Sequence, residues 1–246
     1  MRIALLSDIH ANLEALNACI AHARGQGATR FVFLGDFVGY GADPRAVVEI
    51  VARQVGEGAL AVKGNHDEAV DKPSSYFNDA ARAAIVWARE TLTAEQRRFL
   101  ADLPLTVREG DICFVHASAA APARWNYIDS PSTAQRCVDA TDATYTFCGH
   151  LHEQVLYFES GQKRMREFRP VPGTPIPIFG HRRWLAIVGT VGQPRDRNPA
   201  AAYALFDREL RQLTFFRVAY DASAAAAKIR QCGLPESLAF RVELGI

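Results

Sequence analysis

The chain has 246 residues, 49% of them hydrophobic and 22% charged, with a formal net charge of +1 at pH 7. This composition is typical of a globular protein and excludes extended disorder. Near-neutrality argues against a dedicated binder of long nucleic acids or membrane surfaces, because such proteins are normally strongly basic. No apolar stretch approaches the roughly 18 residues of a transmembrane helix. The five cysteines are scattered and form no Cys-x-x-Cys pair, so we expect a cytoplasmic protein.

The first half of the chain alternates short apolar runs with helical patterns. Asn12 is placed to cap a first helix, and Asp43 a second one that carries proline at its first position. A β-α-β-α-β order of this kind predicts parallel strands. The three strands are predicted at residues 3–6, 31–34 and 60–62.

The rest of the chain reads as a helical insert followed by strands. Residues 78–92 predict a helix, and a capping box at Thr93 opens a shorter one. Alternating apolar residues predict antiparallel hairpins, one with its turn at 160–161. The proline-rich stretch 170–180 is expected to be an ordered loop, and Asp221 to cap a final Ala-rich helix. The predicted strands are 111–115, 144–148, 154–158, 163–169, 185–189, 201–206 and 211–218.

Five predicted strands each end in a cluster of Asp, Asn or His, and these clusters contain five of the seven histidines. Ligands in open α/β sheets lie beyond the carboxyl ends of strands, so we expect the clusters to converge on one crevice. In an extended chain, side chains two residues apart face the same way, which lets Asp8 and His10, or His150 and His152, share a site. The clusters are Asp8-Ile9-His10, Gly35-Asp36, Gly64-Asn65-His66-Asp67, His116 and Gly149-His150-Leu151-His152.

The residue types in these clusters predict a transition-metal site. Carboxylates and imidazoles without thiolates suit Mn, Fe, Zn, Co or Ni, whereas Ca and Mg prefer oxygen ligands. The candidates exceed what one tetrahedral ion needs, which favours two ions that share a ligand. Two ions about 3.5–4 Å apart are the usual arrangement for in-line displacement at phosphorus. The candidate ligands are Asp8, His10, Asp36, Asn65, His116, His150 and His152.

The ordered motifs resemble those of the calcineurin-like metallophosphoesterase superfamily, in particular its small bacterial phosphodiesterases and diadenosine tetraphosphatase-like members. They run Asp-x-His, Gly-Asp-x-x-Gly, Gly-Asn-His-Asp, His and Gly-His-x-His over residues 8–152, and the stretch 189–195 resembles a loop of the small bacterial members. The resemblance implies an α+β fold, a sandwich of two mixed β-sheets packed face to face and flanked by helices. No linker or repeat divides the sequence, so we expect one domain over residues 1–246.

The resemblance also implies a role for each residue of the site. His66 stands outside the ligand set, at the rim of the site, and would protonate the leaving oxygen. A hydroxide bridging the two metal ions would attack phosphorus, and manganese or iron is the expected metal. One ion would be held by Asp8, His10, Asp36 and His152, and the other by Asp36, Asn65, His116 and His150, with the Asp36 carboxylate as the bridge.

The expected reaction is hydrolysis of a phosphodiester or a nucleotide-type phosphoanhydride in a small substrate. The alternatives are a phosphomonoesterase or protein phosphatase, and a non-catalytic scaffold with the same fold. Protein Ser/Thr phosphatases of the superfamily carry Gly-Asp-x-x-Asp-Arg-Gly, whereas residues 35–41 lack that Asp and Arg. A scaffold would be expected to lose ligands, and all candidate positions are filled here. We expect neither long nucleic acid nor a membrane as partner, and the sequence leaves the oligomeric state open.

Two residues outside the ligand set are candidates for contact with the substrate. Arg195 follows a glycine-rich turn and is the best candidate for a phosphate contact. Asn12 is foremost a helix cap, with substrate contact as the alternative. The basic segments 163–169 and 181–183 are interpreted as a solvated hairpin and loop. The alternative is that they bind distal phosphates of the substrate. The histidines outside the clusters are expected at the surface: His22 and His181.

Overall fold

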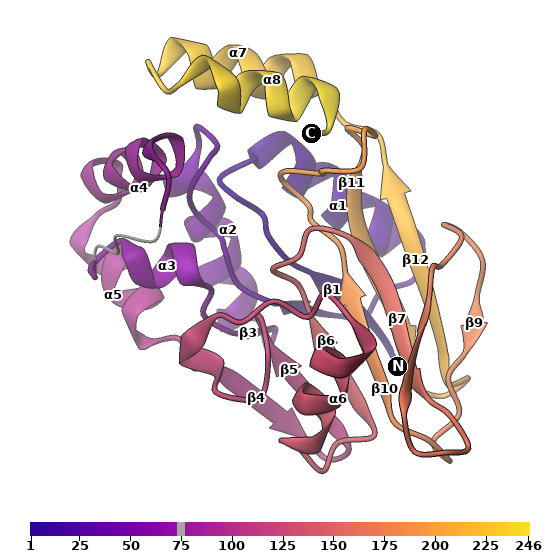
Figure 1. The fold of residues 1–246 in the computed structure, drawn as a ribbon. Helices are drawn as coiled ribbons and strands as arrows, with labels where there is room; N and C mark the ends of the chain where they lie inside the picture. Colours follow the sequence, from indigo (N-terminus) through magenta and orange to yellow (C-terminus); the bar gives the residue numbers. More distant parts are fainter. Residues whose placement is uncertain (73–76) are drawn as a thin grey trace.

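Two six-stranded sheets pack face to face, and helices cover their outer faces (Figure 1). The computed structural model of the chain describes residues 1–72 and 77–246. Each sheet contains both parallel and antiparallel neighbours. The predicted α+β sandwich of two mixed sheets is therefore confirmed.

The first sheet consists, in spatial order, of β3 (Leu60–Ala61), β2 (Arg30–Phe33), β1 (Arg2–Leu6), β11 (Ala201–Asp207), β12 (Gln212–Val218) and β9 (Ile176–Pro177). The strands β1, β2 and β3 are parallel, as their alternation with helices predicts. The hairpin β11–β12 joins β1 in antiparallel orientation. Residues 3–6 form a continuous apolar run because β1 is buried on both faces.

The second sheet consists, in spatial order, of β4 (Thr106–Glu109), β5 (Ile112–Val115), β6 (Tyr145–Cys148), β10 (Trp184–Val188), β7 (Gln154–Glu159) and β8 (Met165–Phe168). The strands β5, β6 and β10 are parallel, and β7 and β8 form the predicted antiparallel hairpin. The main core lies between the two sheets, where Phe147 of β6 meets Phe206 of β11 with ring centroids 5.2 Å apart. The sheets are thereby fixed relative to each other, and so are the loops at their edges.

Helices cover the outer face of each sheet. The first sheet is covered by α1 (Leu13–Gly25), α2 (Pro44–Gly56) and α5 (Ala94–Asp102), and the second by α6 (Pro131–Asp139). A separate apolar cluster joins α4 (Asp79–Thr91) to the C-terminal pair α7 (Ala222–Gln231) and α8 (Glu236–Leu244). This pair lies at the top of Figure 1, above α1. None of the helices in the described ranges is long and apolar enough to cross a membrane.

Several local expectations need correction. Asp221 caps the Ala-rich helix α7 as predicted, but α8 follows it, so α7 is not the final helix. The loop 170–180 contains the short strand β9, which pairs with β12. Asp43 makes no capping hydrogen bond, because its carboxylate accepts one from Lys228 Nζ of α7 at 2.8 Å. Two further short elements, β4 and α6, were not predicted from the sequence.

Candidate metal centre

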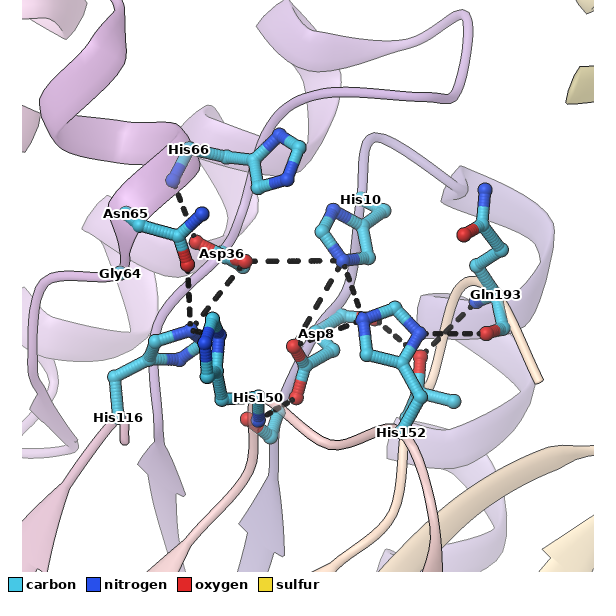
Figure 2. A network of polar contacts seen from close by, with 12 residues as sticks. Asp8, His10, Asp36, Gly64, Asn65, His66, His116, His150, His152 and Gln193 are labelled. Atoms are coloured by element: carbon cyan, nitrogen blue, oxygen red, sulfur yellow. Dashed lines mark hydrogen bonds and ion pairs between the residues drawn. The ribbon is translucent and has the colours of Figure 1, made fainter. Parts of the chain in front are cut away.

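Loops at the carboxyl ends of β1, β2, β3, β5 and β6 bring the seven candidate ligands into one buried cluster (Figure 2). The side chains are at most 9% exposed. Two backbone hydrogen bonds tie neighbouring loops together: Asp8 N–H donates to Gly35 O, and Gly149 N–H donates to His116 O. The strand ends converge as their sequence pattern predicts.

One group within the cluster contains Asp8, His10 and His152. The Nε2 atoms of the two histidines lie 3.0 Å apart, and His152 Nε2 lies 3.2 Å from Asp8 Oδ1. His10 Nε2 is 3.8 Å from Asp8 Oδ1 and 3.8 Å from Asp36 Oδ2. Four potential ligand atoms therefore surround one small volume.

A second group lies on the other side of Asp36. His116 Nε2 lies 3.4 Å from Asp36 Oδ2, 3.2 Å from Asn65 Oδ1 and 3.1 Å from His150 Nδ1. Asp36 Oδ2 thus faces a histidine of each group. Its carboxylate occupies the position between two ligand groups.

The hydrogen bonds of the imidazole rings test whether the cluster fits a metal ion. His10 Nδ1 and His152 Nδ1 each face a backbone carbonyl, as do His116 Nδ1 and His150 Nε2. A carbonyl only accepts, so each of these nitrogens carries the proton, and the other nitrogen of a neutral ring presents a lone pair. The second nitrogens of these rings face one another and carboxylate oxygens, and Asp8 Oδ1 finds no hydrogen-bond partner in the described ranges. Such a set of facing acceptors fits a cation.

The charges of the buried carboxylates lead to the same conclusion. Within the described residues, Asp8 and Asp36 form ion pairs with histidines alone. Burial raises the pKa of Asp36, but His116 and His66 outweigh burial and hold that pKa well below its usual value. Burial lowers the pKa of His116, but Asp36 and Asp8 prevail and raise it to about 9. The carboxylates therefore attract positive charge, and one divalent ion would balance the charges of both.

The backbone of the ligand loops is left-handed at several ligands, whereas the sequence predicted an extended chain there. Asp8, His10, Asp36, His150 and His152 all have positive φ, between 50° and 67°. The pairs two residues apart do share a site, but through left-handed backbone and not through strand alternation. This conformation costs a non-glycine residue about 1–2 kcal/mol, so the surrounding hydrogen bonds must hold it in place.

Two glycines allow the loops to approach the ligands. A Cβ atom at Gly64 would lie 2.1 Å from Asp36 Oδ1, and one at Gly149 would lie 1.8 Å from Ser7 Oγ and 2.4 Å from Asp8 Oδ2. Both positions therefore require glycine on steric grounds. The glycines of the Gly-Asn-His-Asp and Gly-His-x-His motifs are explained by this close packing.

His66 lies within the site and not at its rim, because it is only 3% exposed. Its ring packs against Tyr40, His10 and Phe77, with centroids 4.6 to 4.8 Å apart. Its backbone N–H donates to Asp36 Oδ1 at 2.8 Å, while its Nδ1 finds no hydrogen-bond partner in the described ranges. Burial lowers the pKa of His66 to about 4. The ring is therefore neutral at pH 7 until an anion lies beside it.

A pocket of about 240 Å³ opens beside the ligands, and His66, Tyr40 and Arg195 line it together with Arg241. Arg195 donates to Gln193 Oε1 at 3.0 Å, and its guanidinium lies 5.9 Å from the centre of the Tyr40 ring. A second cavity of about 370 Å³ shares Asn65, Phe77 and Tyr127 with this pocket. The site thus has room for a substrate on two sides.

Asn12 is a helix cap and lies away from the pocket lining. Its Oδ1 accepts from Ala15 N–H, and its amide donates to Gly192 O and to the Tyr220 hydroxyl. The side chain is 3% exposed. These bonds occupy its polar atoms in the fold, which argues against the alternative of substrate contact.

None of the other basic and histidine candidates lines the pocket beside the ligands. Arg183 pairs with Glu159 and Asp139. It precedes β10, whose opposite end reaches the site. Arg169 likewise pairs with Glu153 and Glu167, so the solvated-hairpin interpretation of segments 163–169 and 181–183 agrees with the structure. His181 is exposed as expected. His22 is a correction: it is half-buried, and its Nδ1 lies 2.8 Å from the Tyr203 hydroxyl.

Three residues contribute to the site in ways that the sequence did not predict, although one of them, Asp67, belongs to the Gly-Asn-His-Asp motif. Asp67 accepts hydrogen bonds from the backbone N–H groups of Asp36, Phe37 and Gly64, and so joins two ligand loops. Its place three residues after Gly64, in the first turn of α3 (Asn65–Ala69), was the available signal. The carbonyl of Trp125 fixes the ring of His150. No sequence motif indicated that Arg241 of α8 belongs to the site, because only the tertiary fold brings this residue to the pocket.

The sandwich with a buried Asp, Asn and His cluster at its strand ends is that of a metallophosphoesterase. Residues 1–210 match the model of the calcineurin-like phosphoesterase superfamily domain, and the chain belongs to that family. The family's reaction class is the hydrolysis of phosphoesters, and the resemblance inferred from the motifs is confirmed. Clustered possible metal ligands are present, as such a family requires.

Relatives of similar length support this assignment. An uncharacterized protein of Methanocaldococcus jannaschii is 36% identical over 99% of this chain and 98% of its own. A metallophosphoesterase from Sphaerobacter thermophilus has a similar structure, with a TM-score of 0.90 and 36% identity over 100% of this chain and 99% of its own. A hypothetical protein of Pyrococcus horikoshii shares the fold at a TM-score of 0.80 and 20% identity, covering 100% of this chain and 98% of its own.

Metal binding is expected to stabilise the protein. A metal ion at about a hundred times its dissociation constant adds about 2.7 kcal/mol to the free energy of unfolding, which raises Tm by roughly 5–10 °C. We expect this shift on adding Mn²⁺ to chelator-treated protein in differential scanning calorimetry. The variant His116→Gln should reduce the shift, and His181→Gln, which alters an exposed histidine, should retain it. Equal melting with and without each of Mn²⁺, Fe²⁺, Zn²⁺, Co²⁺ and Ni²⁺ would contradict a metal site.

Proposed function

We propose that the protein is a two-metal hydrolase of a phosphodiester or a nucleotide-type phosphoanhydride, with manganese or iron as the metal. The observation that carries this proposal is the pair of ligand groups on either side of one carboxylate. His10 and His116 each turn a ring nitrogen toward Asp36 Oδ2, at 3.8 and 3.4 Å. A carboxylate in this position can bind an ion on either side, as a two-metal site allows. The ligands would be Asp8, His10, Asp36 and His152 for one ion, and Asp36, Asn65, His116 and His150 for the other.

The residues around the ligands have roles that follow from their positions. Two bound ions would supply polarisation of the phosphoryl group and activation of the attacking water. His66 lies in the pocket with an unpartnered ring nitrogen and, when the phosphoryl anion favours its protonated form, donates a proton to the leaving oxygen. Arg195 contacts phosphate oxygens, and the cavity of about 370 Å³ beside Asn65 receives an organic substituent of the ester.

The alternatives are less well supported. A non-catalytic scaffold does not need a complete ligand set, and here all seven side chains are present and mutually oriented. A protein phosphatase is disfavoured by the short second motif at residues 35–41. The Sphaerobacter thermophilus relative is described as a metallophosphoesterase, which supports metal dependence here. The five cysteines are free, which supports action in the reducing cytoplasm.

The proposed function is tested with purified protein before and after chelation, assayed on bis-p-nitrophenyl phosphate, p-nitrophenyl phosphate and diadenosine tetraphosphate. We expect hydrolysis of the diester or the anhydride that chelation removes and Mn²⁺ restores. Activity on the monoester alone would shift the function to a phosphomonoesterase. Inactivity with every tested metal would favour the scaffold.

A further inference from the structure

One wall of the candidate substrate pocket comes from the C-terminal helix α8. Arg241 stands in the last turn of α8 and lines the pocket together with Arg195, Tyr40 and His66. This helix lies beyond residues 1–210, which match the family model. Apolar packing of α7 and α8 against α4 and against Tyr40 holds the helix beside the pocket.

The two arginines bring positive charge that the fold does not neutralise. In the ranges that the structure describes, neither Arg195 nor Arg241 forms an ion pair with a carboxylate. By contrast, Arg217 pairs with Asp196, and Arg230 pairs with Glu243. A guanidinium left unpaired beside a pocket is suited to bind a phosphate or carboxylate through two parallel hydrogen bonds.

Arg195 and Arg241 line the same pocket as the candidate ligands Asp36, His150 and His152. The Tyr40 ring neighbours both parts of that pocket, with its centroid 4.6 Å from that of His10 and 5.9 Å from the Arg195 guanidinium. A phosphoryl group held at the ligands would leave the arginines facing the next anionic group along the substrate. The pocket therefore offers two anion positions, one at the ligand cluster and one at the arginines.

We infer that Arg195 and Arg241 bind a second phosphate of the substrate, next to the phosphoryl group that reacts. This inference rests on the proposed function and narrows it to substrates with at least two phosphates, such as nucleotide-type anhydrides. A simple diester with one phosphate would leave both guanidinium groups without an anionic partner. Helix α8, which carries Arg241, is thereby assigned a part in substrate selection.

The test compares AMP with its α,β-methylene diphosphate analogue, which adds one non-hydrolysable phosphate. Binding to the Mn²⁺-loaded protein is measured by isothermal titration calorimetry. Because a charge-assisted hydrogen bond contributes about 1.5–3 kcal/mol, we expect wild-type protein to bind the diphosphate at least roughly tenfold more tightly. Arg241→Gln and Arg195→Gln should each reduce that ratio to within about threefold, and Arg241→Lys should retain part of it. The control Arg98→Gln removes an exposed positive charge on α5 and should leave the ratio unchanged.

Equal affinity of wild-type protein for the two nucleotides would overturn the inference. The same holds if Arg241→Gln and Arg195→Gln both keep the wild-type ratio while melting at the wild-type temperature. Calorimetry needs no turnover, so this outcome is distinct from a failure of the proposed function. That failure would be the absence of metal-dependent hydrolysis of any phosphoester by the same preparation.

Discussion

The variant Asp36→Asn is expected to bind at most one metal ion and to lose nearly all phosphoesterase activity. Asp36 Oδ2 is the oxygen that faces a histidine of both ligand groups, and an amide is a much weaker ligand than a carboxylate. Loss of about 4 kcal/mol of charge stabilisation corresponds to a roughly thousandfold fall in kcat/KM. Metal content is measured by plasma mass spectrometry on the same samples that are assayed.

The same substitution should leave the fold intact, which separates a lost ligand from a lost structure. Asparagine keeps the oxygen that accepts from His66 N–H at 2.8 Å. His116 and His66 hold the pKa of Asp36 well below its usual value, so its negative charge stabilises the folded protein at pH 7. We therefore expect metal-free Asp36→Asn to melt below metal-free wild type, but still in a single cooperative transition. The control Asp102→Asn, at an exposed position at the end of α5, should retain two metals and full activity. Full metal content and activity in Asp36→Asn would contradict the shared ligand.

The sequence was sufficient to predict where the site lies in the fold. Each ligand cluster follows a buried apolar run, and buried parallel strands must deliver their carboxyl ends to one edge of a sheet. Asp8, Asp36 and Asn65 follow the three parallel strands of the first sheet, while His116 and His150 follow parallel strands of the second. Face-to-face packing of the two sheets then brings the two sets together.

The backbone conformation of the site could not be predicted from local patterns. An Asp-x-His motif after a strand reads as continued extension, yet Asp8 and His10 both adopt left-handed φ. The hydrogen bonds that favour this conformation come from distant residues: His10 N–H donates to Asp36 O, and His150 N–H donates to Asp8 Oδ2. These hydrogen bonds form only after the strands have paired, so a local sequence pattern does not predict them.

The arginine of α8 illustrates a second limit. Arg241 lies more than half the length of the chain away from the ligand motifs near the N-terminus. An arginine on an amphipathic helix is usually solvated. Helix α8 is held beside the pocket by the apolar cluster that α7 and α8 form with α4 and Tyr40. Sequence periodicity gives such a helix an apolar face, but it does not identify the surface on which that face packs. The substrate side of the pocket is therefore less predictable than the metal side.

Replacement of His66 by glutamine is expected to reduce turnover by about 10²–10⁴-fold for substrates with a poor leaving group. The metal content should stay at the wild-type level, because the seven proposed ligands remain. Proton donation matters most when the departing oxygen is strongly basic. We therefore expect a fall of less than about tenfold for a p-nitrophenyl ester, whose phenolate leaves without assistance, and the full loss for the corresponding phenyl or alkyl ester.

This dependence on the leaving group distinguishes proton donation from two other roles of His66. His10, Asp36 and His66 also lie within the distances that a metal ion allows, so a ligand role would appear as lost metal in His66→Gln. A purely structural role, through the packing of the His66 ring on Tyr40 and Phe77, would slow both esters equally. His22→Gln is a matched control, because it replaces a half-buried histidine that hydrogen-bonds a tyrosine outside the site. Equal losses on the phenyl and p-nitrophenyl esters, with normal metal content, would exclude His66 as the proton donor, since a donor must act on the bond to the leaving oxygen.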